Sequence, residues 1–333
     1  MKTLSGLISL CSFIFILSCQ PDAKQVDVFL QNEKLGRGVN IIGYDAIWNS
    51  FEQARFKEKH FQLIKEAGFN TVRINLHPFR YMDSTTFEIK DHWWKVLDWA
   101  VENALANDLM IILDMHEFHA LADNPEGRKP MWLAFWKQVA AHFQNSSEDV
   151  LFELLNEPFG NLTDELWNQY LSEGLALVRE TNPLRTVIIG PGNWNQISHL
   201  DNLVLPENDR NIIVTIHYYS PMRFTHQGAP WAGRTDSLGV KWNGTEEEKQ
   251  AIIDDFDKAR AWSKEHQRPL FLGEFGVYDK AEMDSRTRYL SFIVDTMEGL
   301  GWSWAYWQYD SDFIVYDIDS DHWIDPVLNA LIH

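Results

Sequence analysis

The feature that most constrains the fold is a repeated alternation between short apolar runs and longer amphipathic stretches. The apolar runs are about four to eight residues long and rich in β-branched side chains, which is typical of strands buried on both faces. They occupy residues 36–43, 70–76, 109–116, 150–157, 186–194, 211–219, 269–276 and 302–310.

Helical patterns separate these runs. Thr163 ahead of Glu165 and Asp284 ahead of Ser285 are expected to cap two of the helices, and Gly68 and Gly301 are expected to end two. The crossover after the fifth strand has a weak helical pattern. The clear helical patterns cover residues 56–68, 92–108, 131–143, 164–182 and 285–301, and the weak one covers 196–203.

Strands buried on both faces and joined by helical crossovers predict a parallel sheet. Eight repeats of this unit predict an α/β fold in which residues 35–333 form a single-domain (β/α)8 TIM barrel. A chain of 333 residues with 45% hydrophobic residues is large enough for such a core. An open doubly wound sheet is the alternative. That fold predicts a glycine-rich phosphate-binding turn after the first strand, but residues 38–50 lack the G-x-G-x-x-G spacing.

The N-terminal residues are typical of an export signal, with Lys2 followed by an apolar stretch too short to span a membrane. Its end, "ILSC", resembles the bacterial lipobox, so residues 1–18 are expected to be a signal peptide and Cys19 the lipidated first residue. Residues 19–34 are expected to be a tether. We therefore expect an exported lipoprotein of the bacterial cell envelope that meets the membrane only through its lipid. An ordinary cleaved signal and a secreted protein are the alternative.

The charge, cysteine and tryptophan content of the chain limits the classes of partner and the disulfides that are expected. The formal net charge is -19 and no basic run occurs, so nucleic acid is excluded as a partner. Cys11 and Cys19 are the only cysteines, and both lie in the export segment, so the mature fold is expected to contain no internal disulfide. The 15 Trp residues offer flat apolar faces on which sugar rings stack, although core packing also explains any single Trp.

Polar or aromatic side chains lie at or near the ends of six of the eight predicted strands. Barrel enzymes collect their active sites at the carboxyl ends of the strands, so these side chains are expected to surround one cleft. The residues are Arg73, His116, Asn156, Glu157, His217, Tyr219, Glu274 and Trp307.

Two carboxylic acids stand out at these ends, Glu157 in "LNEP" and Glu274 in "GEFG". They belong to the fourth and seventh strands, which lie on nearly opposite sides of a closed barrel. A separation of roughly 5 Å suits retaining glycoside hydrolysis, and roughly 6.5–9.5 Å suits inversion. Arg73 and Tyr219 are suited to hold one carboxylate ionised, as a nucleophile requires, while the other carboxyl keeps a proton.

The motifs "VRI", "DMH", "LNEP", "IHYY", "GEFG" and "AYWQ", in this order, resemble those of glycoside hydrolase family 5, the retaining cellulase family. The resemblance covers residues 35–333. The stretches "KEAGFNTVRI", "FTHQGAPW" and "GWSWAYW" are similar to bacterial endo-β-1,4-glucanases of this family, some of which also act on mannan. The resemblance implies a retaining endo-β-1,4-glucanase, or cellulase, that cleaves internal bonds of a β-glucan or related polysaccharide by double displacement. It implies no metal or organic cofactor, and we expect a monomer.

The resemblance also implies roles for individual residues. Glu157 is expected to be the general acid and base, and Glu274 the nucleophile. Asn156 is expected to bind the sugar 2-hydroxyl next to the cleaved bond, while Arg73 and Tyr219 orient and tune Glu274.

Further residues are expected to line the cleft. His217 is expected beside Glu157, His116 at a sugar hydroxyl, and Trp307 under a sugar ring. Relatives often have a second His after His116, whereas this chain has Glu117, which leaves substrate preference open. The possible subsite residues are Asn40, Glu117, Trp194, His226 and Trp231.

Three alternatives to a cofactor-independent endoglucanase are compared with the sequence. A β-mannanase, a mixed-linkage β-glucanase or a xyloglucanase of the same family is the nearest. A non-catalytic, glycan-binding surface lipoprotein is disfavoured, because both acids and their partners are present. Metal sites are also disfavoured: "HEFH" at 116–119 lacks zinc-peptidase spacing, and the acidic tract 309–321 lacks the EF-hand glycine and final Glu, so we expect a solvated loop there.

Overall fold

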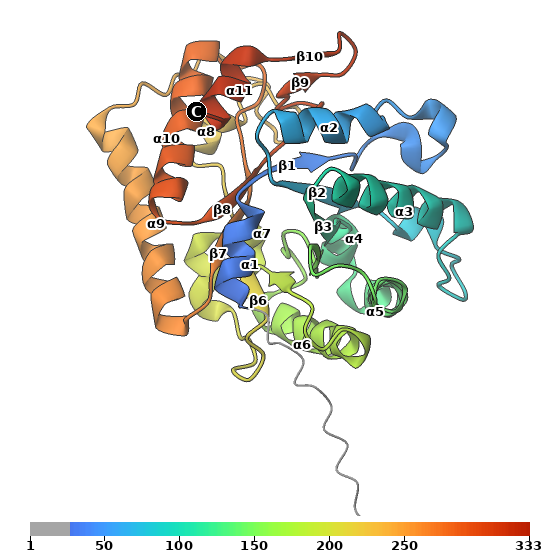
Figure 1. Ribbon diagram of the computed structural model, residues 1–333. Helices are drawn as coiled ribbons and strands as arrows, with labels where there is room; N and C mark the ends of the chain where they lie inside the picture. The colour runs from blue at the N-terminus through green and yellow to red at the C-terminus, as the bar shows by residue number, and fades with distance from the viewer. Residues whose placement is uncertain (1–26) are drawn as a thin grey trace, which may run out of the picture.

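Eight parallel strands close into a barrel, and they follow one another around the ring in chain order. The computed structural model describes residues 27–333; the expected signal peptide and Cys19 lie outside the described residues. Strand β8 pairs with β1, with Gly38 beside Ala305, which closes the ring. The predicted TIM barrel is therefore confirmed (Figure 1). The strands are β1 Arg37–Ile41, β2 Thr71–Leu76, β3 Met110–Met115, β4 Val150–Glu153, β5 Val187–Ile189, β6 Ile212–Tyr218, β7 Leu270–Phe275 and β8 Ser303–Tyr306.

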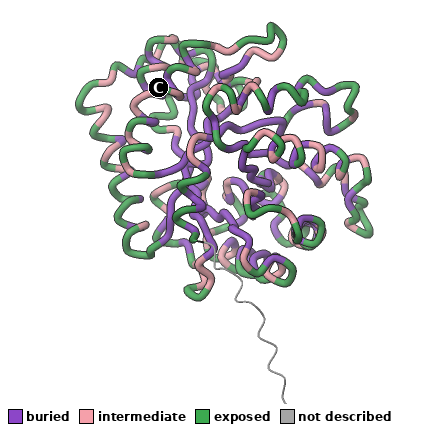
Figure 2. Tube along the Cα trace, in the orientation of Figure 1, coloured by how far each residue is buried: buried purple, intermediate pink, exposed green. Residues whose placement is uncertain are grey.

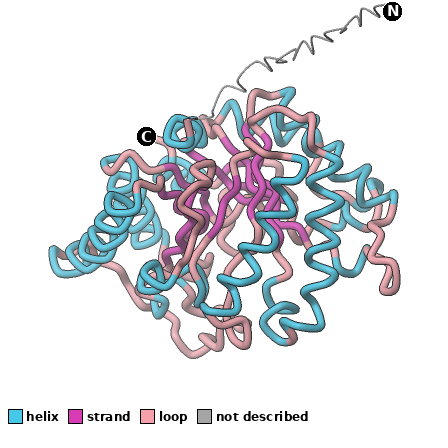
Figure 3. The backbone as a smooth tube through the Cα atoms, turned by 90° about the horizontal axis from the view of Figure 1, so that it is seen from below, coloured by secondary structure: helices cyan, strands magenta, loops and turns pink. Residues whose placement is uncertain are grey.

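Helices surround the strands, as Figure 3 shows with the strands gathered inside and the helices around them. The main crossover helices are α2 Glu58–Glu66, α3 Asp91–Ala106, α5 Pro125–His142, α6 Asp164–Thr181, α9 Glu246–His266 and α10 Met283–Gly299. Shorter segments extend the loops after several strands or end the chain: α4 Phe118–Asp123, α7 Gly192–Asn195, α8 Met222–Thr225 and α11 Asp325–Leu331.

The crossovers differ from the prediction in three places. Helix α9 was not predicted, because only Ile252, Phe256, Ala259 and Trp262 of its 21 residues are buried, which leaves a narrow apolar stripe. Asp284 lies inside the first turn of α10 rather than at its cap. The weak fifth crossover consists of α7 and a 3₁₀ segment at residues 197–202. The predicted cap at Thr163 is confirmed, since its hydroxyl accepts a hydrogen bond from the Leu166 N–H.

The predicted tether is wrong for residues 28–34, which form most of helix α1 Val28–Leu35. This helix covers the amino ends of the strands. Asn32 donates to the Leu270 carbonyl over 3.0 Å and accepts from the Ser303 hydroxyl over 2.8 Å. The prediction failed because α1 exposes Phe29 and Leu30 while it buries polar side chains against strand ends, the reverse of the usual pattern.

Burial follows the layers of the barrel: the strands are buried and the outer faces of the helices are exposed (Figure 2). The main core lies between the strands and the helices. A separate apolar cluster fills the barrel at the end that α1 covers. Its members are Val28, Leu35, Met110, Ile112, Leu151, Ile188, Ile213, Phe271 and Ala305.

The acidic tract near the C-terminus is organised by ion pairs. Its residues Tyr316–Asp317 form β9, which pairs antiparallel with β10 His322–Trp323 just after the tract, so the tract is not only a loop. Asp310 lies 3.3 Å from Arg55, and Asp321 lies 2.6 Å from Lys59. These carboxylates bind cationic side chains of the first crossover. Among residues 27–333, no helix is long and apolar enough to cross a membrane.

Candidate active site

Arg73 lies at the centre of the polar end of the barrel. It was predicted at a strand end, but it occupies the middle of β2 and is fully buried. Its guanidinium binds both carboxylate oxygens of Glu153, at 2.7 and 2.8 Å, and donates to Glu274 over 2.9 Å. It also donates over 2.8 Å to the side-chain oxygens of Asn40 and Asn156. Arg73 therefore binds four side chains at once, which come from β1, from β4 and the residues just after it, and from β7.

Glu153 and Asp114 are functional-site neighbours that sequence reasoning missed. Both are fully buried inside strands, and Asp114 lies 3.1 Å from Arg73. Burial raises the pKa of Asp114 to about 6 and that of Glu153 to about 7, although Arg73 opposes both shifts. The signal that marks them is an acid within an otherwise apolar strand, because a buried acid needs a charged partner.

Glu274 lies on β7 and is almost fully buried. Besides Arg73, the Tyr219 hydroxyl donates to it over 3.1 Å. Burial raises the pKa of Glu274, while the positive charge of Arg73 and both hydrogen bonds favour the ionised form. The preceding Gly273 is required for space, because a Cβ there would lie 2.4 Å from Thr215 Oγ1 and 3.0 Å from His217 Nε2.

Glu157 lies just beyond β4, where Pro158 prevents regular pairing from continuing. Its backbone has a φ of 40°, an uncommon conformation for a residue other than glycine. Its carboxylate lies 2.7 Å from Nδ1 of His217. Burial raises the pKa of Glu157 well above its ordinary value, and the negative charge of Glu274 raises it further.

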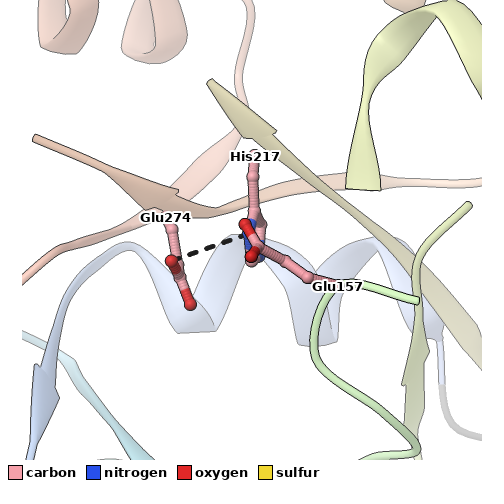
Figure 4. Close-up of side chains that lie close together, drawn as sticks. All are labelled: Glu157, His217 and Glu274. Carbon is pink, nitrogen blue, oxygen red and sulfur yellow. Dashed lines mark hydrogen bonds and ion pairs between the residues drawn. The ribbon is translucent and has the colours of Figure 1, made fainter. Parts of the chain in front are cut away.

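The two acids converge as predicted (Figure 4). Glu157 and Glu274 point toward each other from the loop after β4 and from β7, with His217 of β6 beside them. One oxygen of each carboxyl lies within 4.8 Å of the other. Since Arg73 contacts Glu274, whereas the hydrogen-bond partner of Glu157 is His217, Glu274 ionises first and Glu157 holds the remaining proton. This spacing matches the roughly 5 Å that retaining hydrolysis requires.

Among residues 27–333, Glu157, His217 and Glu274 form a group whose geometry could also hold a metal ion, because one ligand atom from each lies within 4.8 Å of the others. In the structure Glu157 and His217 bind each other, and Tyr219 donates to Glu274. These contacts suit proton sharing between the two acids.

Asn195 supports His217 and was also missed. Residues 193–195 all adopt left-handed backbone angles, which turn the fully buried Asn195 side chain inward. Its Nδ2 lies 3.3 Å from Nε2 of His217. In the tautomer in which Nε2 accepts this hydrogen bond, Nδ1 donates to Glu157. Trp194, the residue predicted here, instead stacks on Phe159 with the ring centroids 3.8 Å apart.

An aromatic wall adjoins the acids. The His116 ring stacks on Trp307, with centroids 5.5 Å apart and planes 9° apart, and Asp114 lies 2.5 Å from its Nδ1. Asn156 Nδ2 lies 3.5 Å from the other ring nitrogen of His116. Tyr44, which is 61% exposed, meets the edge of Trp307 and extends this wall outward.

The remaining predicted residues separate into three groups. Asn40 is fully buried and hydrogen-bonds to Arg73 and to the carbonyls of Gly273 and Tyr306, so it supports the site from within the barrel. His226 packs between Tyr219 and Trp231, and Trp231 is 57% exposed, so an open aromatic face lies two rings away from Tyr219. Glu117 accepts a hydrogen bond of 2.8 Å from the Phe79 N–H and so joins the loops after β3 and β2.

A closed eight-stranded barrel with two converging carboxyls, one beside an arginine and one beside a histidine, defines a glycoside hydrolase of the paired-carboxyl class. The chain belongs to the cellulase family, glycosyl hydrolase family 5, which matches residues 32–312. The resemblance inferred from the motifs is thereby confirmed.

Known relatives agree with this assignment. The chain is 32% identical to endoglucanase H of Acetivibrio thermocellus, over 93% of this chain and 34% of that protein. It is 26% identical to endoglucanase 3 of Fibrobacter succinogenes, over 84% of this chain and 50% of that protein. The chain thus spans a third to a half of the length of these two relatives. Cel5A of Thermotoga maritima, solved with cellobiose, superposes with a TM-score of 0.88 at 40% identity and covers 92% of this chain and 100% of that one.

Proposed function

We propose that this protein is a retaining endo-β-1,4-glucanase. The observation that carries the proposal is the paired carboxyls: an oxygen of Glu157 lies within 4.8 Å of one of Glu274, and only Glu274 is bound by Arg73. One acid is therefore prepared to attack and the other to donate a proton, at a spacing that suits retention.

In the first step, the carboxylate of Glu274 attacks the anomeric carbon while Glu157 protonates the departing glycosidic oxygen. The bond between the anomeric carbon and that oxygen breaks, and a glycosyl ester with Glu274 forms. Arg73 and the Tyr219 hydroxyl hold Glu274 in place for this attack. Asn156 accepts from Arg73 through its oxygen, which leaves its amide nitrogen to donate to the sugar 2-hydroxyl.

In the second step, Glu157 acts as a base. It is ionised after the first step and takes a proton from a water molecule, whose oxygen attacks the anomeric carbon and releases Glu274. His217 holds Glu157 in both steps, and its pKa, lowered well below the usual value by burial and by Arg73, keeps the ring neutral. Trp307 provides the face on which the reacting sugar stacks, and the exposed Trp231, which packs on His226, offers a second aromatic face.

The backbone of the substrate is proposed to be β-1,4-glucan, since the curated relatives named above are endoglucanases. A β-mannanase is the second candidate, because Cel5A of Thermotoga maritima has also been solved with mannotriose as substrate. Glucan and mannan differ at the 2-hydroxyl, which the Asn156 amide faces. Xyloglucan, which has a β-1,4-glucan backbone, and mixed-linkage glucan, in which β-1,3 bonds interrupt the β-1,4 bonds, are further candidates.

Release of reducing ends from a panel of polysaccharides tests this proposal. Carboxymethylcellulose, barley β-glucan, lichenan, xyloglucan, glucomannan and galactomannan are compared for the wild type and for Glu274→Ala. We expect the largest kcat/KM on a β-glucan and no turnover by the variant on any substrate. Faster cleavage of galactomannan than of every glucan would favour the mannanase. No turnover by the wild type would instead favour a glycan-binding lipoprotein.

We also propose that the protein is exported and anchored by lipid at Cys19, because the first residues resemble a lipoprotein signal. Labelling cells with a fatty-acid probe is expected to mark the wild type and not Cys19→Ala. A Cys19→Ala protein that is still labelled and still retained by membranes would exclude the anchor.

A further inference from the structure

A second hollow adjoins the aromatic wall of the active site. It has a volume of about 430 Å³ and lies among the loops that follow β1, β2 and β3. Tyr44 belongs to both places, since it lines the hollow and meets the edge of Trp307. A glycan chain that leaves the acids over Trp307 and Tyr44 therefore passes this hollow. Its lining residues are Tyr44, His77, Phe79, Arg80, Glu117, Ala120 and Arg128.

The lining of the hollow includes two arginine side chains that have no directly bound anion among the described residues. Arg80 and Arg128 are both exposed. Within the part of the chain that the structure describes, neither guanidinium has a carboxylate within 4.0 Å or a hydrogen-bond partner. The chain as a whole has a net charge of -19, so two open guanidinium groups in one hollow contrast with their surroundings.

The other polar groups of the hollow do not cancel this charge. Glu117 turns one oxygen into the wall, where it accepts from the Phe79 N–H. Burial raises the pKa of Glu117, while the positive charges of Arg80 and Arg128 oppose this shift. His77 stacks near Tyr44 and His116, and burial keeps its ring neutral. Two positive groups thus face at most one carboxylate.

We propose that this hollow binds a carboxylate-bearing sugar, a uronosyl unit within or attached to the β-1,4-glycan that occupies the cleft. The half-exposed ring of Tyr44 offers a face for the sugar. The planar guanidinium groups of Arg80 and Arg128 match the two oxygens of a carboxylate. The proposal rests on the proposed function, and it makes the enzyme selective for acidic positions along its substrate.

Matched oligosaccharides test the proposal by calorimetry. The ligands are cellopentaose and five derivatives, each with a single C6 hydroxymethyl group oxidised to a carboxylate at one ring position. All are titrated into Glu157→Gln, in which loss of the acid slows turnover. We expect one positional isomer to bind roughly threefold to tenfold more tightly than cellopentaose, since each exposed charge pair contributes modestly. This preference should shrink in about 0.5 M salt, because salt screens exposed charges.

Two double variants in the same background identify the source of the preference. Arg80→Gln/Arg128→Gln is expected to abolish it while the affinity for neutral cellopentaose stays within about twofold of the parent protein. Arg260→Gln/Lys264→Gln removes two exposed cations from α9 and controls for overall charge; it should retain the preference. The proposal fails if no isomer is preferred, if Arg80→Gln/Arg128→Gln keeps the preference, or if both double variants lose it equally.

If the proposed function itself is wrong, the binding and cleavage results will differ from those expected when only the inference about the hollow is wrong. Neutral cellopentaose would then neither bind to Glu157→Gln nor be cleaved by the wild type. Binding and cleavage of neutral cellopentaose without any preference for an acidic isomer would overturn only the inference about the hollow.

Discussion

The two ends of the barrel are built from the same eight strands but have opposite chemistry. At the amino ends, α1 covers an apolar cluster that includes Val28, Leu35 and Phe271. At the carboxyl ends, Arg73 lies among Glu153, Asp114 and Glu274, all buried. The barrel therefore runs from a closed apolar layer at the amino ends to an open end where β2, β3, β4 and β7 contribute charged side chains.

This difference means that the apolar end mainly stabilises the fold, whereas the charged end mainly serves the reaction. Apolar burial at the closed end stabilises the fold in proportion to the area removed from water. Buried charges at the open end contribute little net stability, because their desolvation offsets their attraction. They instead hold two acids in different protonation states, which the closed end cannot do. Substitutions at the two ends should accordingly change different measurements.

The largest effect is expected from removing the nucleophile. Glu274→Gly should lower kcat by at least about 10⁴-fold, since the covalent step is lost. Azide, a small anion that fits the vacated space, should restore part of the activity on an aryl cellobioside. A fully active variant, or one that azide does not rescue, would contradict the assignment of Glu274.

Replacing the acid should give a smaller effect that depends on the substrate. Glu157→Ala should reduce cleavage of β-glucan by about 10²–10⁴-fold, because the sugar leaving group requires protonation. Cleavage of a dinitrophenyl cellobioside should suffer far less in its first step, since that leaving group departs without a proton. Equal losses in kcat/KM on both substrates would contradict the acid role.

A pair of variants then compares the two ends directly. Arg73→Lys should lower kcat by about 10²-fold, because the forked contacts that position Glu274 and Asn156 are lost. Leu35→Ala should lower the free energy of unfolding by about 2–5 kcal/mol and leave kcat/KM unchanged below its melting temperature. Denaturant unfolding and steady-state kinetics on both variants check the contrast. A Leu35→Ala protein that is stable but catalytically impaired would contradict this contrast between the two ends of the barrel.

The smallest effect concerns stability and pH between pH 7 and 8.5. In this range the buried histidines His116 and His217, whose pKa values are lowered, are neutral in the folded state and largely neutral in the unfolded chain, where histidine titrates at about pH 6.5. Glu153, with a pKa raised to about 7, and Glu157 hold protons in the folded state that the unfolded chain has released. Stability should therefore fall as the pH rises through this range.

Thermal unfolding at both pH values measures this slope. Leu35→Ala should keep the slope of the wild type, because it removes no titrating group. Glu153→Gln should reduce the slope even though it is less stable. A melting temperature that rises from pH 7 to pH 8.5 would refute the assignment of raised pKa values at the open end.

Much of the fold follows from the sequence because the eight strands are buried on both faces and therefore apolar throughout. Helices α1 and α9 were missed because their contacts are largely polar or restricted to a narrow stripe. In the site, Glu157 and Glu274 stand out because each closes an apolar run. Glu153 and Asn195 do not, since their importance depends on Arg73 and His217, which lie far from them in sequence and reach them only in the closed barrel.

The stereochemistry of the first product tests most directly whether Glu157 and Glu274 act as a retaining pair. Proton NMR recorded during early hydrolysis of a cello-oligosaccharide resolves the two anomers before they interconvert. Two displacements through Glu274 predict the β-anomer first, followed by slow appearance of the α-anomer. Immediate release of the α-anomer would mean that water attacks directly and would contradict the account.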